Sequence, residues 1–394
     1  PTDWPSHFAP SAWTHESKMG GKHNQWYCHL FAPERPDWNW DNPEIEADFL
    51  KTLKFWADRG VDGFRIDVAH GMKKDLSEPL KNQPSFPSHK DLDLNPGQNV
   101  LFDRDELHDI YKEWRQLFNQ YDPPRVAVAE ASVPASRLVK YASPDELGQS
   151  FNFELFDANF NAGEFKLIID RALINAKKNG SSTTWCLNNH DQMRPATKFG
   201  LLPTVDRVRW RNSNGKLNPL DEKLGTQSAV AASMLIMALP GCTYIYQGEE
   251  LGLPEHTTLE EKYREDPTFF RTNGQRVGRD GCRVPLPWEA GVGAANGFNE
   301  TGLAWLPQPE LYAEYSRDQQ EGVAGSTLEL YKQALALRKS LRVGEGSFAW
   351  LPQFTNERAL GYRNGNILVI HNFGTDALLV VTRQIWVTLI KSYV

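Results

Sequence analysis

Short apolar runs alternate with longer segments of helical periodicity between about residues 43 and 248. The short runs are rich in β-branched and aromatic residues, which is typical of strands. Because strands that alternate with helices usually form βα units around a parallel sheet, the predicted fold class is α/β. The five predicted strands are residues 61–68, 125–130, 149–155, 184–188 and 243–247.

The segments between these strands have the periodicity and the end signals of helices. Over residues 43–59, Ile45, Phe49 and Leu53 recur at helical spacing, Asn42 can cap the first turn, and Gly60 can end the helix. The same reasoning predicts further helices at residues 105–120, 164–178, 226–239 and 326–340.

Two regions depart from this alternation. Residues 253–309 are rich in Gly, Pro, Arg and Asp and show little periodicity, which predicts a long loop insertion; loops of that length are usually functional. From residue 348 onward, alternation at 360–362, 367–371 and 378–381, with the turn pair Asn364-Gly365, predicts a small antiparallel β module.

A closed (β/α)8 TIM barrel needs eight strands and about 250 residues, so five strands account for only part of one. At roughly 30 residues per βα unit, we expect the first three strands of such a barrel to be absent from this sequence. We expect residues 1–42 to end an irregular insertion, 43–340 to form the C-terminal part of the barrel, and 341–394 to form a truncated β domain. Such a fragment, incomplete at its N-terminus, should expose sheet edges and have little or no activity.

Composition excludes several classes of protein. Of the 394 residues, 40% are hydrophobic and 24% charged, which describes a soluble globular chain rather than a disordered one. The net charge of −7 and the lack of a basic block argue against nucleic acid as a partner. The apolar stretch over residues 229–239 is too short to cross a bilayer, so we expect a core helix there and no membrane partner.

Neither a metal nor a cofactor is predicted. The cysteines Cys28, Cys186, Cys242 and Cys282 lack C-x-x-C spacing, so we expect buried free thiols and a cytoplasmic location. Four irregularly spaced histidines near the N-terminus favour a structural role over zinc binding. Walker, H-E-x-x-H, G-x-S-x-G and dinucleotide motifs are all missing from the sequence.

The segment Asp62-Gly-Phe-Arg-Ile-Asp-Val-Ala-His70 contains the most informative chemistry. Side chains alternate along a strand, so Arg65 and Asp67 share one face. An R-x-D pair in a strand is most often a structural ion pair. The C-terminal ends of barrel strands, however, are where active sites form, which favours a functional role at this position.

Two further acids end predicted strands. Glu130 follows Val-Ala-Val-Ala, and Asp191 follows Leu-Asn-Asn-His, 63 and 61 positions after the preceding acid. Three carboxyl groups at one barrel mouth are costly to bury unless chemistry requires them. Glu249 and Glu250 follow the last strand, where contact with substrate and a loop-capping role are both open.

Paired carboxylates fit glycoside hydrolysis, in which one attacks the anomeric carbon and the other protonates the leaving oxygen. Asp67 stands beside Arg65 and should stay ionised, which suits a nucleophile. Glu130 follows an apolar strand and faces a negative neighbour, so its pKa should rise, which suits the acid. Asp191, with a neutral His190 beside it, is left to hold sugar hydroxyls.

The strings GFRIDVAH, AVAEAS and LNNHDQMR resemble three motifs of the α-amylase superfamily, glycoside hydrolase family 13, and RPDWNWDNPE resembles a fourth. PGCTYIYQGEELGLPE and RDGCRVPLPWE are similar to segments of its α-glucosidase and oligo-1,6-glucosidase branch. The resemblance implies that Asp67 is the nucleophile, Glu130 the acid/base and Asp191 the transition-state stabiliser. Arg65 and His190 match supporting positions, and Arg194 resembles the arginine that closes the pocket around a nonreducing glucose.

Some positions differ from the family pattern. The D-x-x-x-N-H motif and the first-loop calcium segment are missing, Arg35 and Trp38 stand where Gln and Leu are usual, and Val68 does not decide the linkage. The expected function is that of a retaining, exo-acting α-glucosidase acting on small oligosaccharides such as maltose, isomaltose or sucrose. The alternatives are a glucosyltransferase or sucrose isomerase with the same residues, and a noncatalytic binding subunit.

Overall fold

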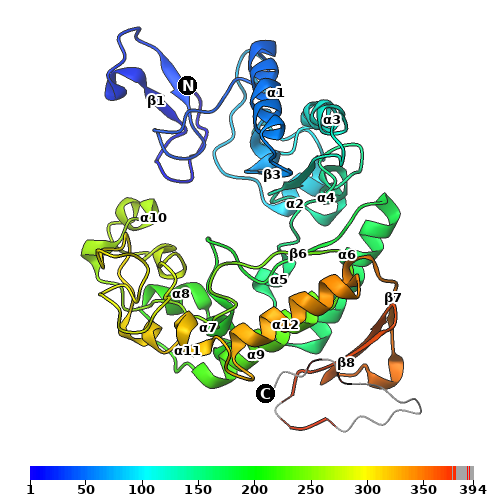
Figure 1. Ribbon diagram of the computed structural model, residues 1–394. Coiled ribbons are helices and arrows are strands. Elements are labelled where there is room, and N and C mark those ends of the chain that lie inside the picture. Colours follow the sequence, from blue (N-terminus) through cyan, green and yellow to red (C-terminus); the bar gives the residue numbers. More distant parts are fainter. Residues whose placement is uncertain (375, 379–387, 389, 391–394) are drawn as a thin grey trace. The chain divides into compact units, whose positions relative to one another are not determined.

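The computed structural model describes residues 1–374, 376–378, 388 and 390 (Figure 1). The chain forms two compact units. The first unit comprises residues 1–151 and 173–183, and the second comprises residues 152–172 and those from 184 onward.

The first unit contains a pair of parallel strands covered by helices. Strands β3 (Gly63–Ile66) and β4 (Val126–Ala129) pair in register, with Gly63 opposite Val126 and Ile66 opposite Ala129. Helices α1 (Pro43–Asp58) and α3 (Leu107–Phe118) bury apolar side chains with both strands in one core. The other elements are β1 (Trp13–His15) and β2 (Trp26–Cys28), which pair antiparallel, α2 (His89–Leu94) and α4 (Ala135–Tyr141).

The predicted ends of the first long helix are confirmed. Asn42 caps α1, since its Oδ1 accepts a hydrogen bond of 3.0 Å from the Glu44 amide, and Pro43 occupies the first turn. Gly60 follows with a φ of +93°, a conformation that glycine adopts without strain.

The second unit contains a parallel pair of short strands and most of the helices. Strand β5 (Thr184–Trp185) pairs with β6 (Cys242–Thr243). Helix α7 (Pro195–Gly200) packs tightly on α9 (Glu222–Met237), where a Cβ on Gly225 would lie 2.0 Å from the Ala196 carbonyl oxygen. The remaining helices are α5 (Glu154–Asp157), α6 (Ala162–Asn179, whose last residues belong to the first unit), α8 (Arg207–Asn212), α10 (Pro267–Arg271), α11 (Arg317–Gln320) and α12 (Thr327–Ser340).

Short 3-10 helices punctuate the loops of both units. They are η1 (Glu16–Met19), η2 (Ala69–Gly71), η3 (Glu261–Tyr263), η4 (Asp280–Cys282), η5 (Glu310–Ala313), η6 (Val343–Glu345) and η7 (Pro352–Phe354). Residues 253–309 otherwise have irregular structure apart from α10, as the sequence predicts.

The strand predicted at residues 149–155 is wrong over most of its length. A single bridge joins Ser150 to Ala129, and α5 begins at Glu154. The physical reason is local: the Asn152 side chain accepts a hydrogen bond of 3.0 Å from the Glu154 amide, which starts a helical turn in place of a strand.

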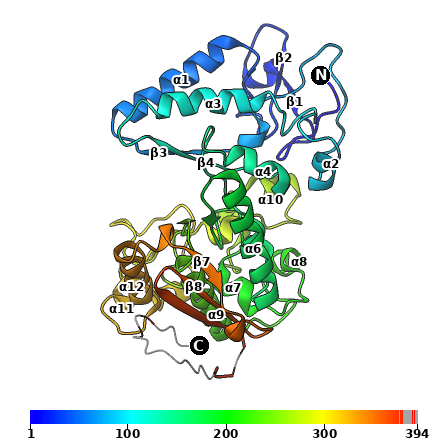
Figure 2. The ribbon, with the colours of Figure 1, turned by 90° about the vertical axis from the view of Figure 1, so that its right-hand side faces the viewer.

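The C-terminal strands pair antiparallel in the order β7 (Phe348–Trp350), β8 (Ala359–Asn364) and β9 (Ile367–Asn372) (Figure 2). The turn that joins β8 to β9 is Gly365-Asn366, one residue later than predicted. Of the strand predicted at 378–381, Leu378 is not in a strand and residues 379–381 lie outside the described residues. The three-part division at residues 42 and 340 stays a prediction.

All four cysteines are free thiols. Burial raises the pKa of Cys28 in the first unit to about 12, and burial raises the pKa of Cys186 and Cys282 in the second unit further still. At neutral pH these three thiols therefore stay protonated.

Candidate active site

The backbone brings Asp67 and Glu130 to the same ends of β3 and β4. The Glu130 amide donates to the Ile66 carbonyl at 2.9 Å, and the Ala69 amide donates to the Glu130 carbonyl at 2.8 Å. The parallel pairing thus continues past the last residue of each strand. Both acids stand at the carboxyl ends of the strands, where α/β active sites form.

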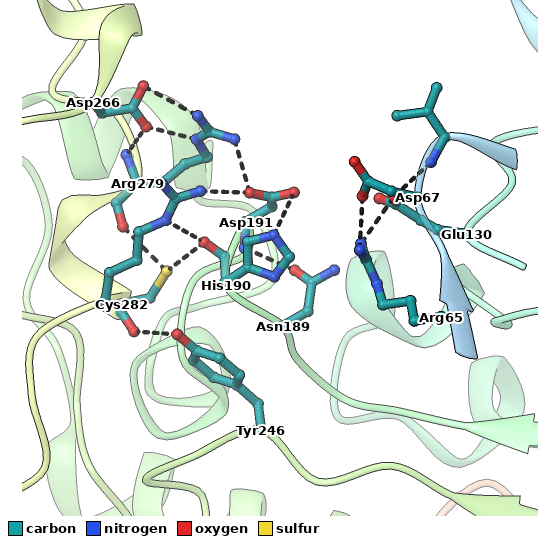
Figure 3. A network of polar contacts seen from close by, with 12 residues as sticks. Arg65, Asp67, Glu130, Asn189, His190, Asp191, Tyr246, Asp266, Arg279 and Cys282 are labelled. Atoms are coloured by element: carbon teal, nitrogen blue, oxygen red, sulfur yellow. Dashed lines mark hydrogen bonds and ion pairs between the residues drawn. The ribbon is translucent and has the colours of Figure 1, made fainter. Parts of the chain in front are cut away.

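Arg65 contacts both carboxyl groups (Figure 3). Its Nη1 lies 2.7 Å from Asp67 Oδ1 and its Nη2 lies 2.9 Å from Glu130 Oε2. The side chain of Asp67 is 65% exposed, whereas that of Glu130 is 20% exposed. One guanidinium therefore holds two carboxyl groups that differ in their access to water.

This difference in exposure causes the two carboxyl groups to differ in how readily they bind a proton. The pKa of Glu130 is raised to about 7, mainly by burial and in addition by a hydrogen bond with Asp67 and by the charge of Asp67. The Val68 amide and the Arg65 charge act in the opposite direction. A carboxyl group with this pKa can donate a proton near neutral pH and accept one after a small change in its surroundings.

Val68 has a backbone conformation that is uncommon for a β-branched residue, with a φ of +43°. Its amide donates to Glu130 Oε2 at 3.2 Å. Backbone strain of this kind persists where surrounding structure enforces it, and here it aims an N–H group at the acid.

Asp191 lies in the second unit, in the loop that follows β5. Its amide donates to Asn189 Oδ1 at 2.9 Å, which closes a local turn. Its Oδ1 accepts from Arg279 Nη1 at 2.8 Å and from Arg283 Nη2 at 2.7 Å. The Nε2 of His190 lies 3.6 Å from Oδ2. One carboxylate oxygen of Asp191 thus binds two arginine side chains, and a histidine lies near the other oxygen.

Sequence reasoning missed Arg279 and Arg283 as partners of Asp191. Both lie in the RDGCRVPLPWE segment, on either side of η4, which turns their side chains toward one carboxylate. Two arginines four positions apart in a predicted functional loop were the available signal.

Arg194 is fully buried, and its guanidinium donates to the backbone carbonyls of Gln247 at 2.8 Å and Cys282 at 2.9 Å. These bonds fasten two loops together. Glu250 caps its own turn by accepting a hydrogen bond of 2.8 Å from the Gly248 amide, in line with the structural alternative for this residue. Glu249 is buried, and burial raises its pKa to about 8.

The six predicted site residues therefore fall into two groups. Arg65, Asp67 and Glu130 contact one another within the first unit. Asp191 and His190 contact each other in the second unit, which also contains Arg194. Convergence of all three acids on one sugar stays a prediction. Among the described residues, no cluster of three or more His, Cys, Asp or Glu could hold a metal ion.

Comparison with known proteins identifies the family. Residues 1–344 match the alpha amylase catalytic domain. The oligo-1,6-glucosidase of Parageobacillus thermoglucosidasius is 28% identical to this chain, and the trehalose-6-phosphate hydrolase of Escherichia coli is 30% identical. Each match covers 86% of this chain and 60% of the relative's own length. The chain thus spans about three-fifths of these relatives.

A solved structure supports the same assignment. The alpha-glucosyl transfer enzyme XgtA superposes with a TM-score of 0.76 at 27% identity, over 95% of this chain and 67% of that one. This likeness is consistent with a TIM-barrel fold. No helix among the described residues is both long and apolar enough to span a membrane. The chain belongs to the α-amylase catalytic-domain family, glycoside hydrolase family 13.

Proposed function

We propose that this chain carries the catalytic residues of a retaining, exo-acting α-glucosidase. The observation that carries the proposal is the pair formed by Asp67 and Glu130, which one guanidinium holds at the ends of neighbouring strands. Burial raises the pKa of Glu130 to about 7, so a large fraction of it keeps its proton near neutral pH, while Asp67, more exposed and paired with Arg65, acts as the anion.

The spacing of the pair supports retention of configuration. Inverting glycosidases separate their two carboxyl groups by about 6.5–9.5 Å to admit a water molecule, whereas retaining enzymes hold them about 5–5.5 Å apart. The two terminal nitrogens of Arg65 contact Asp67 at 2.7 Å and Glu130 at 2.9 Å, so one guanidinium keeps the two carboxyl groups close together, in line with the shorter spacing.

The reaction proceeds in two steps. Asp67 attacks the anomeric carbon as the glycosidic C–O bond breaks, and Glu130 gives its proton to the leaving oxygen. The resulting ester at Asp67 carries no charge, so the pKa of Glu130 falls. Glu130 then takes a proton from water, whose oxygen attacks the anomeric carbon and frees Asp67.

The supporting role proposed for Asp191 and His190 is to hold sugar hydroxyls as positive charge develops on the ring. A substrate contact by Arg194 stays a prediction, because its guanidinium is committed to backbone carbonyls. Small oligosaccharides of the maltose, isomaltose or sucrose type are the proposed substrates. The four free cysteines support a cytoplasmic location.

A second candidate function keeps the same residues and transfers glucose to a sugar acceptor in place of water. The likeness to an alpha-glucosyl transfer enzyme favours this alternative over a noncatalytic role. The carboxyl pair itself argues against a purely binding subunit, because an acid with a raised pKa beside an ionised acid serves catalysis better than it serves stability.

Trapping of the covalent intermediate tests the proposal even when turnover is slow. The chain is incubated with 5-fluoro-α-glucosyl fluoride, a substrate analogue that loses fluoride and leaves its sugar esterified to the nucleophile. We expect mass spectrometry to find the sugar on the peptide that contains Asp67, and no label on the Asp67→Asn variant. A label on another residue, or none, would refute the assignment. Free glucose and transfer products from maltose, isomaltose and sucrose then separate hydrolysis from transfer.

A further inference from the structure

Asp266 lies in the long loop of the second unit, at the start of α10, outside every motif that suggested the function. We propose that Asp266 is a positioning residue, which acts through Arg279 to fix the carboxylate of Asp191. The inference rests on the proposed function, because it assumes that the orientation of Asp191 matters for glycosyl transfer.

The carboxylate of Asp266 is fully buried and its oxygens are occupied (Figure 3). Oδ2 accepts from Arg279 Nε at 2.6 Å and from the Arg279 amide at 2.8 Å. Oδ1 accepts from the Thr268 amide at 2.8 Å and from Arg279 Nη2 at 3.3 Å. Backbone amides therefore fix the acid, and the acid in turn fixes the plane of the guanidinium.

Arg279 transmits this order to Asp191. Its Nε and Nη2 are engaged by Asp266, which leaves Nη1 to donate to Asp191 Oδ1 at 2.8 Å. Burial alone would lower the pKa of Arg279, but the hydrogen bonds and charges of Asp266 and Asp191 together outweigh burial and raise it. A long side chain that is immobilised in this way before substrate binds loses little entropy in the reaction.

The backbone around Asp266 is shaped to bring this acid close to Arg279. Gly278, directly before Arg279, has a φ of +75°, and a Cβ at this position would lie 2.6 Å from Asp266 Cβ. Only glycine allows the two chain segments to approach so closely. The approach is what lets one carboxylate accept both the amide and the side chain of Arg279.

A second arginine, Arg283, distinguishes loss of orientation from loss of charge at Asp191. It donates to the same oxygen of Asp191 at 2.7 Å and does not depend on Asp266 for this contact. Removal of the Asp266 charge therefore leaves Asp191 with a cation, and the expected loss is one of orientation. Orientation affects the transition state more than substrate binding, so the reaction rate should fall with little change in affinity.

Asp103 in the first unit provides a matched control. It is also fully buried and pairs with an arginine Nε, that of Arg137, at 2.7 Å, but both residues of this pair belong to the first unit, whereas Asp191 belongs to the second. Asp103→Asn and Asp266→Asn thus remove the same charge from the same kind of ion pair. A purely structural role for Asp266 predicts similar behaviour of the two variants.

The experiment measures labelling by 5-fluoro-α-glucosyl fluoride, with the maximal rate and the half-saturating concentration determined separately. We expect Asp266→Asn to lower the maximal rate by about 10- to 100-fold with little change in half-saturation. Asp103→Asn should leave both parameters near those of the parent. Arg279→Lys keeps the charge but cannot span two carboxylates, so it should reproduce the loss and serves if Asp266→Asn does not fold.

Crystal structures of the two Asp→Asn variants give a readout that needs no turnover. The proposal predicts that Arg279 leaves Asp191 Oδ1 in Asp266→Asn and remains there in Asp103→Asn. An unmoved Arg279, or equal loss of labelling rate in both variants, would overturn it. If the parent itself is not labelled, the proposed function fails, and the position of Arg279 still decides whether Asp266 orients Asp191.

Discussion

Replacement of Asp67 by asparagine should lower the pKa of Glu130. Asparagine keeps the shape of the side chain and removes its charge, which reproduces the neutral state of Asp67 in the covalent intermediate. The same measurement therefore tests whether Glu130 can change from acid to base between the two steps.

The size of the shift follows from the contacts. The pKa of Glu130 rises from 4.5 to about 7, first through burial and then through the hydrogen bond and charge of Asp67. Burial survives the substitution, whereas both contributions of Asp67 disappear and Arg65 keeps its contact of 2.9 Å with Glu130. We expect a fall of about 1–2 pKa units, which corresponds to about 1.4–2.7 kcal/mol.

The assay is a titration by carbon-13 NMR of protein labelled at the glutamate side-chain carboxyl, with the Glu130 signal assigned from Glu130→Gln. Asp62→Asn is the control, since it removes an exposed acid that is paired with Arg125 at 3.1 Å in the same unit. Asp62→Asn should leave the titration of Glu130 unchanged. A pKa of Glu130 that stays the same or rises in Asp67→Asn would refute the charge assignment.

Three further predictions concern stability. Because the folded state raises the pKa of Glu130, its ionisation costs stability as pH rises from 4.5 through about 7; urea unfolding should find Glu130→Gln more stable than the parent by about 1–3 kcal/mol at pH 8 and not at pH 4.5. Burial lowers the pKa of Lys198 from 10.5 to about 7, so stability should increase between pH 7 and pH 10 in the parent, and a similar increase in Lys198→Met would contradict this. Gly225→Ala would place a Cβ 2.0 Å from the Ala196 carbonyl oxygen, and calorimetry should show destabilisation of at least about 2 kcal/mol. An unchanged melting temperature would contradict this prediction, because it would mean that α7 and α9 can move apart at little cost in free energy.

Local patterns in the sequence predicted the elements that depend on local interactions. The cap at Asn42, the apolar spacing in α1 and the strands around Arg65 and Glu130 follow from neighbouring residues, and the structure confirms them. The segment after Gln149 was misread because its apolar residues suit a strand equally well, while a single Asn152 side chain decides in favour of a helical turn.

The predicted rise in the pKa of Glu130 agrees with the structure because burial and a like charge could both be inferred from an apolar strand and a neighbouring acid. The partners of Asp191 could not be inferred in this way. Arg279 and Arg283 reach it from about 90 positions further along the chain, through a loop without periodicity. Contacts that depend on how an irregular loop folds leave no pattern in the sequence. The same limit hid the burial of Arg194.

The three buried, protonated thiols can be used to follow how the chain unfolds. Alkylating reagents attack the thiolate, so Cys28, Cys186 and Cys282 should resist them while the surrounding structure stays closed. Cys28 lies in the first unit and the other two lie in the second. Peptide-resolved alkylation rates in increasing urea would therefore report whether the two units unfold together or one at a time, with no label engineered into the chain.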